Sequence, residues 1–182
     1  MSKKDRILLY FNVGLLLISI IMLFNSSLPL IVPFKPSGTT STEILLKRAY
    51  ANFLIPKHGA IHIGARYADE LTAYKKFSIP DILWIEADPS AEKKLRSITA
   101  TDPNSKIAMF AATDQNGTIA LNVASNSGYS SSILKFKNHI HMDPSVTTKT
   151  IVTVPQKRLD DYLHKDPALK DIKYNLLVID IQ

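Results

Sequence analysis

The sequence contains no cysteine. This absence excludes a disulfide-stapled fold, a cysteine-ligated zinc site, a thiol nucleophile and a CxxC redox pair. It leaves the cellular compartment open, because a chain without thiols carries no mark of the redox potential around it. Low-complexity tracts do not dominate either, since 46% of the 182 residues are hydrophobic and 21% are charged. This composition and length predict one globular domain with an appendage.

A concentrated basic surface is lacking as well. The net charge is +6, but basic and acidic residues mostly alternate after residue 35, whereas a nucleic-acid-binding protein gathers its positive charge on one element. We therefore expect no nucleic-acid partner. Half of the net charge comes from the first 35 residues, which contain Lys3, Lys4, Arg6 and Lys35 against Asp5.

The longest apolar run lies near the N-terminus. Residues 7–24 read ILLYFNVGLLLISIIMLF and are interrupted only by Asn12, Gly14 and Ser19. A membrane-spanning helix needs about 20 apolar residues, with a lower limit of roughly 17, so the run predicts a transmembrane signal anchor. A cleaved signal peptide is the second interpretation, although its apolar region is usually only about 7–15 residues long. A buried core helix is the third.

Basic residues precede this run and are scarce after it. Three of them lie in the flank 1–6, and the next is Lys35. This asymmetry predicts a single-pass membrane protein with a cytosolic N-terminus and an extracytosolic domain. Residues 25–42 are rich in proline, serine and threonine, which is typical of a linker. We expect the folded domain to occupy residues 43–182.

The domain alternates between strand-like and helix-like segments. Helices of this length between strands imply right-handed crossovers and a mainly parallel sheet, so the predicted fold class is α/β. Two further segments, 117–125 and 148–155, alternate by two as strands do. The apolar segments that predict the parallel strands are 59–65, 81–88, 106–113 and 174–182.

Small and acidic residues follow these predicted strands at their carboxyl ends, where α/β sheets bind ligands. The first strand ends in Gly64 and Ala65, whose small size lets the backbone approach a ligand closely. The second ends in Glu86 and Asp88. An acidic residue about 20 residues after the first turn can accept hydrogen bonds from both hydroxyls of a ribose.

The other two strands end in Asp114 and Asp180, so three of the four strand ends are acidic. The segment IHIGARYADE has one glycine, whereas the pyrophosphate-binding motif G-x-G-x-x-G has three. A dinucleotide is therefore disfavoured. A nucleoside that lacks phosphate and carries a positive charge, such as S-adenosylmethionine, suits an acidic rim better.

Six short motifs follow one another along residues 57–182: IHIGARYADE, ILWIEADP, AATDQNGT, SNSGYSSSIL, QKRLDDYL and NLLVIDIQ. Their order and spacing resemble those of the FkbM-type methyltransferases, which are Rossmann-like enzymes dependent on S-adenosylmethionine. The resemblance implies that the turn at Ile63, Gly64 and Ala65 holds the methionine part of this cofactor and that Glu86 holds its ribose. Asp88 completes the acidic rim beside Glu86.

The resemblance also implies a place for the adenine and for the reaction. Ala112 and Asp114 would lie near the adenine, and Asp180 would face the reacting centre as a base or an orienting residue. The alternative is that Asp180 only caps the turn after its strand. The implied activity is O-methylation of a hydroxyl on a glycan or a small metabolite.

Two departures from the family pattern stand out. The family carries a second glycine three or four residues after the first, where this chain has Tyr67 and Ala68. The family also continues past its DIQ motif with Gly-x-Glu and further strands, whereas this sequence stops at Gln182. We therefore expect a domain that is incomplete at its C-terminus and whose last strand has an unpaired apolar edge.

These observations leave three functions open: a membrane-anchored methyltransferase, an inactive binding or interaction module of the same fold, and a nucleotide-sugar enzyme. We expect no metal site. His139, His141 and Asp143 have ligand-like spacing, but a polar loop is the simpler interpretation. His62, on the first predicted strand, is expected to be an ordinary buried histidine with satisfied hydrogen bonds.

Overall fold

A computed structural model describes residues 18–23, 41–51, 58–126, 128, 130–134 and 146–181. Strands and helices alternate along most of this chain, as the sequence predicts. In order, the elements are β1 (Ile18–Leu23), α1 (Ser41–Ala51), β2 (Ala60–Ile63), α2 (Leu71–Lys76), β3 (Ile82–Glu86), the 3₁₀ turn η1 (Pro89–Ala91), α3 (Glu92–Thr99), β4 (Ser105–Met109), β5 (Ala111–Ala112), β6 (Gly117–Ala124), β7 (Thr148–Lys157), α5 (Leu159–Lys165) and β8 (Leu176–Ile181).

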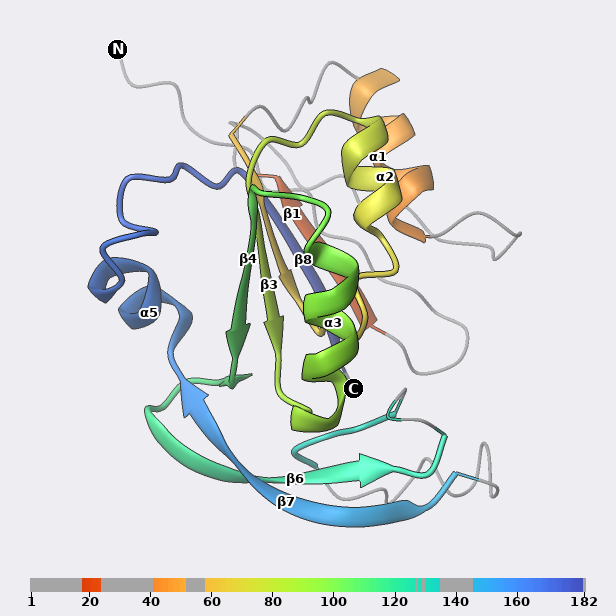
Figure 1. Ribbon diagram of the computed structural model, residues 1–182, viewed down its shortest axis with the longest axis vertical. Helices are drawn as coiled ribbons and strands as arrows, with labels where there is room; N and C mark the ends of the chain where they lie inside the picture. The colour runs from red at the N-terminus through yellow and green to blue at the C-terminus, as the bar shows by residue number, and fades with distance from the viewer. Residues whose placement is uncertain are drawn as a thin grey trace.

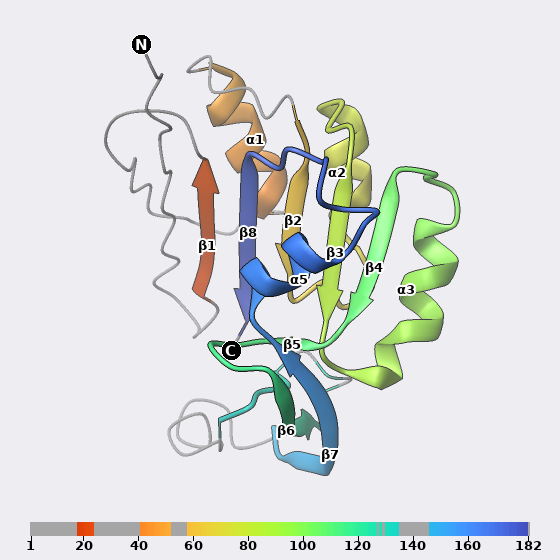
Figure 2. The same ribbon diagram turned by 90° about the vertical axis from the view of Figure 1, so that its left-hand side faces the viewer.

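The central sheet has five strands in the order β1-β8-β2-β3-β4, as Figure 2 shows. Strands β8, β2, β3 and β4 run parallel to one another, so the predicted α/β class with a mainly parallel sheet is confirmed. Their arrangement follows the first four strands of a doubly wound sheet, whose order is 3-2-1-4. The strand order reverses between β2 and β8, and such a switch point is where these folds bind ligands.

Both faces of this sheet are covered. Strands β2 and β3 are buried along their whole length, which suits parallel strands with helices on both sides. On one face Trp84 packs with Leu46 of α1, Tyr74 of α2 and Leu95 of α3. On the other face α5 and the segment that follows it cover the sheet, and Leu169 joins the buried cluster there. Figure 1 shows the resulting three layers.

Strands β6 and β7 form a separate sheet below the carboxyl ends of the parallel strands (Figure 1). They pair antiparallel from Gly117 opposite Gln156 onward, while the short strand β5 runs parallel to β7. The strands predicted at 117–125 and 148–155 are therefore confirmed as strands, but they do not extend the parallel sheet. A small apolar cluster holds the separate sheet together and contains the buried side chains of Ala111, Leu121, Val123 and Val154. The sheet closes the lower end of the domain in Figure 1.

The loop between β2 and α2 covers residues 64–70. Helical spacing begins at residue 66, but α2 begins at Leu71, because Arg66 and Ala68 have left-handed backbones with φ of 45° and 57°. Ala68 is one of the two residues that stand where the FkbM-type pattern carries a second glycine. It is buried, and its backbone has a left-handed conformation that glycine adopts more readily. The turn after β2 therefore contains a left-handed residue that is not glycine.

The N-terminal strand β1 differs from the helix that the sequence predicts. Residues 18–23 belong to the apolar run 7–24, yet they pair antiparallel with β8, with Ile18 opposite Ile181 and Leu23 opposite Leu176. Two physical reasons favour a strand: β-branched isoleucines fit a sheet well, and the apolar edge of β8 is unfavourable when unpaired. The unpaired edge expected for the last strand is thus absent from the described structure.

Much of the predicted N-terminal organisation lies outside the described residues. This applies to the flank 1–6, to residues 7–17 and 24 of the predicted anchor, and to residues 25–40 of the predicted linker. Residues 41 and 42 of that linker begin α1. Among the residues that the structure does describe, no helix is both long enough and apolar enough to cross a membrane.

Candidate functional site

A cavity of about 250 Å³ lies at the carboxyl ends of β2, β3 and β8. Its position at the switch point is the one where doubly wound sheets bind ligands. The volume is slightly below the roughly 300–1,000 Å³ of most small-molecule sites, so a nucleoside cofactor would extend past the enclosed part. Six of the eight residues predicted from the sequence line this cavity: Ile63, Gly64, Ala65, Glu86, Ala112 and Asp180.

Gly64 forms the tightest contact between two of the cavity's walls. Its backbone has φ of +85°, and a Cβ atom added there would lie 1.9 Å from the backbone oxygen of Asp180. No side chain fits at that distance, and the left-handed backbone independently favours glycine. The ends of β2 and β8 therefore meet closely because residue 64 has no side chain, which brings Asp180 next to the turn after β2.

Glu86 holds the two loops that frame the cavity. Its Oε1 accepts a hydrogen bond of 2.7 Å from the backbone N–H of Asp88, and its Oε2 accepts one of 2.6 Å from that of Arg66. Burial raises the pKa of Glu86, and these hydrogen bonds partly oppose that shift. Each carboxylate oxygen has a second lone pair, so Glu86 can accept further hydrogen bonds from a ligand in the cavity.

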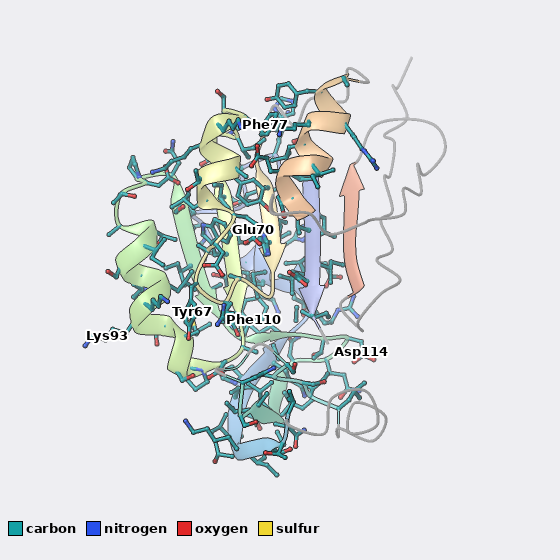
Figure 3. All side chains as sticks on the ribbon, turned by 90° about the vertical axis from the view of Figure 1, so that its right-hand side faces the viewer. Tyr67, Glu70, Phe77, Lys93, Phe110 and Asp114 are labelled. Atoms are coloured by element: carbon teal, nitrogen blue, oxygen red, sulfur yellow. The ribbon has the colours of Figure 1, made fainter. Side chains whose placement is uncertain are left out.

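The other two predicted acids do not line the cavity. Asp88 is buried beside it, where its carboxylate accepts a hydrogen bond of 2.9 Å from the backbone N–H of Ser90 and caps η1. Asp114 is exposed on the turn between β5 and β6, at the edge of the domain in Figure 3. The cavity is nevertheless acidic, because Asp69 and Glu70 join its lining from the loop before α2.

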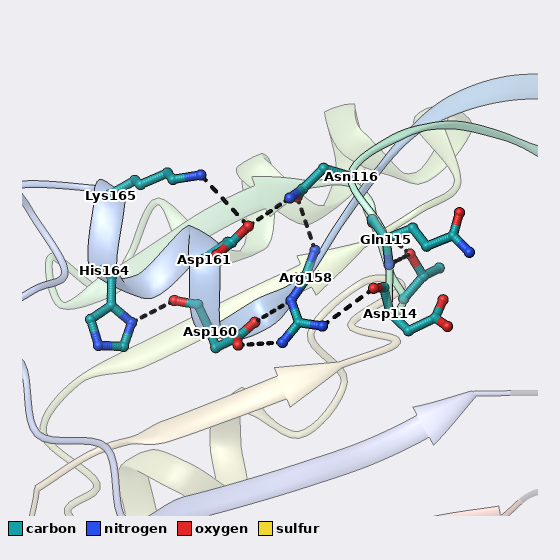
Figure 4. A network of polar contacts seen from close by, with 9 residues as sticks. Asp114, Gln115, Asn116, Arg158, Asp160, Asp161, His164 and Lys165 are labelled. Carbon is teal, nitrogen blue, oxygen red and sulfur yellow. Dashed lines mark hydrogen bonds and ion pairs between the residues drawn. The ribbon is translucent and has the colours of Figure 1, made fainter.

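A polar network explains the position of Asp114 (Figure 4). The Arg158 guanidinium, at the junction of β7 and α5, donates to the backbone oxygen of Asp114 at 3.4 Å. Asn116 links the same two segments, because its Oδ1 accepts from the backbone N–H of Arg158 at 3.2 Å and its Nδ2 donates to Asp161 at 2.6 Å. The contact with Asn116 also lowers the pKa of Asp161. The turn is therefore tied to α5 rather than to the cavity.

Replacing Asn116 with alanine removes the hydrogen bond that its side chain donates to Asp161 and the one that it accepts from the backbone N–H of Arg158. A typical hydrogen bond contributes about 0.5–1.5 kcal/mol, and the site is exposed, so we expect the free energy of unfolding to fall by about 1 kcal/mol. Urea unfolding followed by circular dichroism measures this change. Asn104→Ala, at another exposed asparagine, serves as the control and should stay within about 0.5 kcal/mol of the unmodified chain. Equal effects of the two substitutions would contradict a structural role for Asn116.

The sequence pattern does not single out several residues of the cavity. Phe110 and Leu121 supply apolar walls from the end of β4 and from β6, and Glu70 lies where α2 begins. Only the position of Glu70 inside the motif IHIGARYADE hints at a role. Ser131 and Ser132 line the cavity as well.

Three titratable side chains meet beside the cavity, and two of them line it. His62 of β2, Glu70 and Asp180 of β8 offer a nitrogen and two carboxylate oxygens that all lie within 4.8 Å of one another. Burial raises the pKa of Glu70 to about 7. Burial lowers the pKa of His62 to about 4, against the opposing charge of Asp180. The cluster thus holds an imidazole that is neutral at pH 7 beside two acidic groups.

His62 is only partly the satisfied histidine that we expected. It is fully buried, and its Nδ1 lies 2.8 Å from the hydroxyl of Tyr74. Its Nε2, however, has no hydrogen-bond partner among the described residues. The candidate ligands His139, His141 and Asp143 lie outside the described residues.

Comparison of the chain with family models, with curated proteins and with solved structures finds no match. The function of the chain therefore has to be inferred from the cavity and from the motif pattern together. Gly64, Glu86 and Asp180 belong both to the motif pattern and to the lining of the cavity.

Proposed function

We propose that the chain has a class I methyltransferase fold and is an S-adenosylmethionine-dependent O-methyltransferase that acts on a hydroxyl of a glycan or a small metabolite. The observation that carries this proposal is the buried carboxylate of Glu86 in the wall of a cavity at the switch point between β2 and β8. A carboxylate at the end of the second parallel strand is the group that a ribose requires in a fold of this type.

The residues of the cavity fit this cofactor. Glu86 would hold the ribose, and the turn at Gly64 and Ala65, which lines the cavity, would hold the methionine part. Ala112 and the aromatic ring of Phe110 would supply apolar surface for the adenine. The carboxylates of the lining suit a cofactor that carries positive charge. When bound, S-adenosylmethionine supplies an electrophilic methyl group.

The chain itself would orient the acceptor and remove its proton. Methyl transfer needs the acceptor oxygen held in line with the methyl group, and such positioning is the main contribution that a protein makes. Asp180 lines the cavity at the end of β8, so its carboxylate would accept a hydrogen bond from the acceptor hydroxyl and then its proton. Ser131 and Ser132, which also line the cavity, would contact the acceptor.

Calorimetric titration of S-adenosylhomocysteine into the full chain, purified in a mild detergent, tests this proposal. We expect saturable binding at one equivalent, with heats that adenosine reduces in competition. The same titration with uridine diphosphate glucose distinguishes the nucleotide-sugar alternative. Binding of that compound in place of S-adenosylhomocysteine, or no binding of S-adenosylhomocysteine by a chain with a cooperative unfolding transition, would rule the proposal out.

A further inference from the structure

The cluster of His62, Glu70 and Asp180 is built from three separate elements. His62 lies on β2, opposite Trp84 of β3 and Val178 of β8 in the sheet register. Asp180 follows Val178 by two residues and therefore projects from the same face of the sheet. Glu70, the residue just before α2, lies over this face near the middle of the sheet in Figure 3. Fold geometry, rather than a sequence motif, brings the three side chains together.

The imidazole of His62 carries the decisive observation. The side chain is 1% exposed, and Nε2 has no hydrogen-bond partner among the described residues. Oε2 of Glu70 lies 4.0 Å from Nε2, which is beyond hydrogen-bonding distance. Buried polar atoms are nearly always satisfied in folded proteins. A buried ring nitrogen aimed at carboxylates without reaching them indicates that another group binds between them.

The other ring nitrogen is already held in place. Nδ1 of His62 lies 2.8 Å from the hydroxyl of Tyr74, which is itself fully buried on α2. If Nδ1 donates its hydrogen to that hydroxyl, the lone pair of Nε2 points toward Glu70 and Asp180. Metal-binding histidines are typically fixed in this way, through a hydrogen bond from the nitrogen that does not bind the metal.

We propose that His62, Glu70 and Asp180 form a binding site for one divalent first-row transition metal ion, of which Zn²⁺ is the simplest probe. Imidazole and carboxylate donors suit such ions, and bonds of about 2.0–2.2 Å place two ligand atoms of a tetrahedral ion about 3.3–3.6 Å apart. The ligand atoms here lie within 4.8 Å of one another, so small side-chain rotations bring all three into bonding distance.

Three protein ligands leave a coordination position open, as in catalytic metal sites. Glu70 and Asp180 line the cavity whereas His62 lies behind them, so the open position faces the cavity. An ion there would bind an oxygen atom of a molecule in the cavity. That an acceptor hydroxyl supplies this oxygen rests on the proposed methyl transfer, but metal binding itself does not.

Equilibrium dialysis of the full chain against Zn²⁺, without any nucleoside present, tests the site. We expect one equivalent of Zn²⁺ to bind, and Co²⁺ to compete for the same site with visible absorption bands. The substitutions Glu70→Gln and Asp180→Asn keep the shape of each side chain while removing its charge. Each should weaken the binding of Zn²⁺ at least about 100-fold, more than the loss of an outer-shell partner usually does.

Matched controls separate this site from surface binding. Asp69→Asn changes a carboxylate that also lines the cavity but is not part of the cluster, and His164→Asn changes an exposed histidine on α5. Both should leave the affinity for Zn²⁺ within a factor of about two. Absence of stoichiometric binding, or equal affinity in the cluster variants and the controls, would overturn the proposal. Because S-adenosylhomocysteine is titrated separately, failure of the metal site and failure of the cofactor site are distinguishable.

Discussion

The substitution Gly64→Ala is expected to destabilise the domain more than the same substitution at Gly59, Gly117 or Gly128, the other glycines that the structure describes. Its Cβ would lie 1.9 Å from the backbone oxygen of Asp180, so β2 and β8 would have to separate. The left-handed backbone adds about 1–2 kcal/mol for a residue other than glycine, and overpacking adds about 1–3 kcal/mol. We therefore expect the free energy of unfolding to fall by roughly 2–5 kcal/mol, measured by urea denaturation.

Gly117→Ala is the matched control for this substitution. Gly117 also has a positive φ, of 142°, but the nearest atom to an added Cβ is Nε2 of Gln156 at 3.8 Å. The control therefore reports backbone strain alone, for which we expect a loss of about 1–3 kcal/mol. An effect of Gly64→Ala no larger than that of Gly117→Ala would contradict the close approach of β2 and β8 at Gly64.

The second large effect is expected at Glu86. We predict that Glu86→Ala raises the dissociation constant of S-adenosylhomocysteine at least about 100-fold. A hydrogen bond to a charged group contributes about 1.5–3 kcal/mol, and the carboxylate would accept one from each ribose hydroxyl. Isothermal titration calorimetry measures the change. Asp114→Ala should leave the affinity unchanged, because Asp114 is exposed outside the cavity.

Glu86→Ala also removes the acceptor for the backbone N–H groups of Arg66 and Asp88. Lower affinity in this variant alone could therefore reflect a rearranged loop. Glu86→Gln retains the shape and one acceptor oxygen, so we expect a smaller weakening of at least about 10-fold, the equivalent of one lost charged hydrogen bond. Unchanged affinity in a Glu86→Gln variant that unfolds cooperatively would contradict the assignment of the ribose to this residue.

The parallel sheet and the core of the site follow from local sequence patterns. Short apolar runs that end in Gly64, Glu86 and Asp180 are enough to predict three parallel strands, and parallel strands in a doubly wound sheet bring their carboxyl ends to one edge. The cavity that these residues share is a consequence of that topology. Chain order therefore predicts that Gly64, Glu86 and Asp180 meet there.

Asp114 shows where this reasoning fails. Residues 106–113 read as one strand, and a strand that continued to residue 113 would deliver Asp114 to the same edge. The structure ends β4 at Met109 and begins the short β5 at Ala111, which pairs with β7. The turn that follows is held by Arg158, a contact 44 residues away in the sequence that no local pattern reveals.

The cluster of His62, Glu70 and Asp180 was hidden for a similar reason. Metal sites are predicted from closely spaced ligands, whereas Asp180 lies on β8 and the other two side chains come from β2 and the loop before α2. Only the parallel pairing of β2 with β8 places His62 beside Val178 and thus near Asp180. The sequence likewise gives no sign that Nε2 of His62 has no hydrogen-bond partner among the described residues.

The apolar run at residues 7–24 is ambiguous by its nature. A continuous apolar segment is compatible with a membrane-spanning helix and with a buried strand, because periodicity cannot distinguish the two. Residues 18–23 pair with β8 in the structure, and the same six residues cannot lie within a bilayer at the same time. Because the rest of the predicted anchor, residues 7–17 and 24, lies outside the described residues, the anchor remains a prediction. A protease-protection assay on membranes that contain the chain tests it.

The most direct test of the account is a crystal structure of the chain in complex with S-adenosylhomocysteine. We predict density for the nucleoside in the cavity, with both ribose hydroxyls within about 3.2 Å of the Glu86 carboxylate and the methionine part over the turn at Gly64 and Ala65. Density for the ligand at any other place, or an empty cavity in crystals grown with saturating ligand, would contradict the central claim that Glu86 and this cavity bind the cofactor.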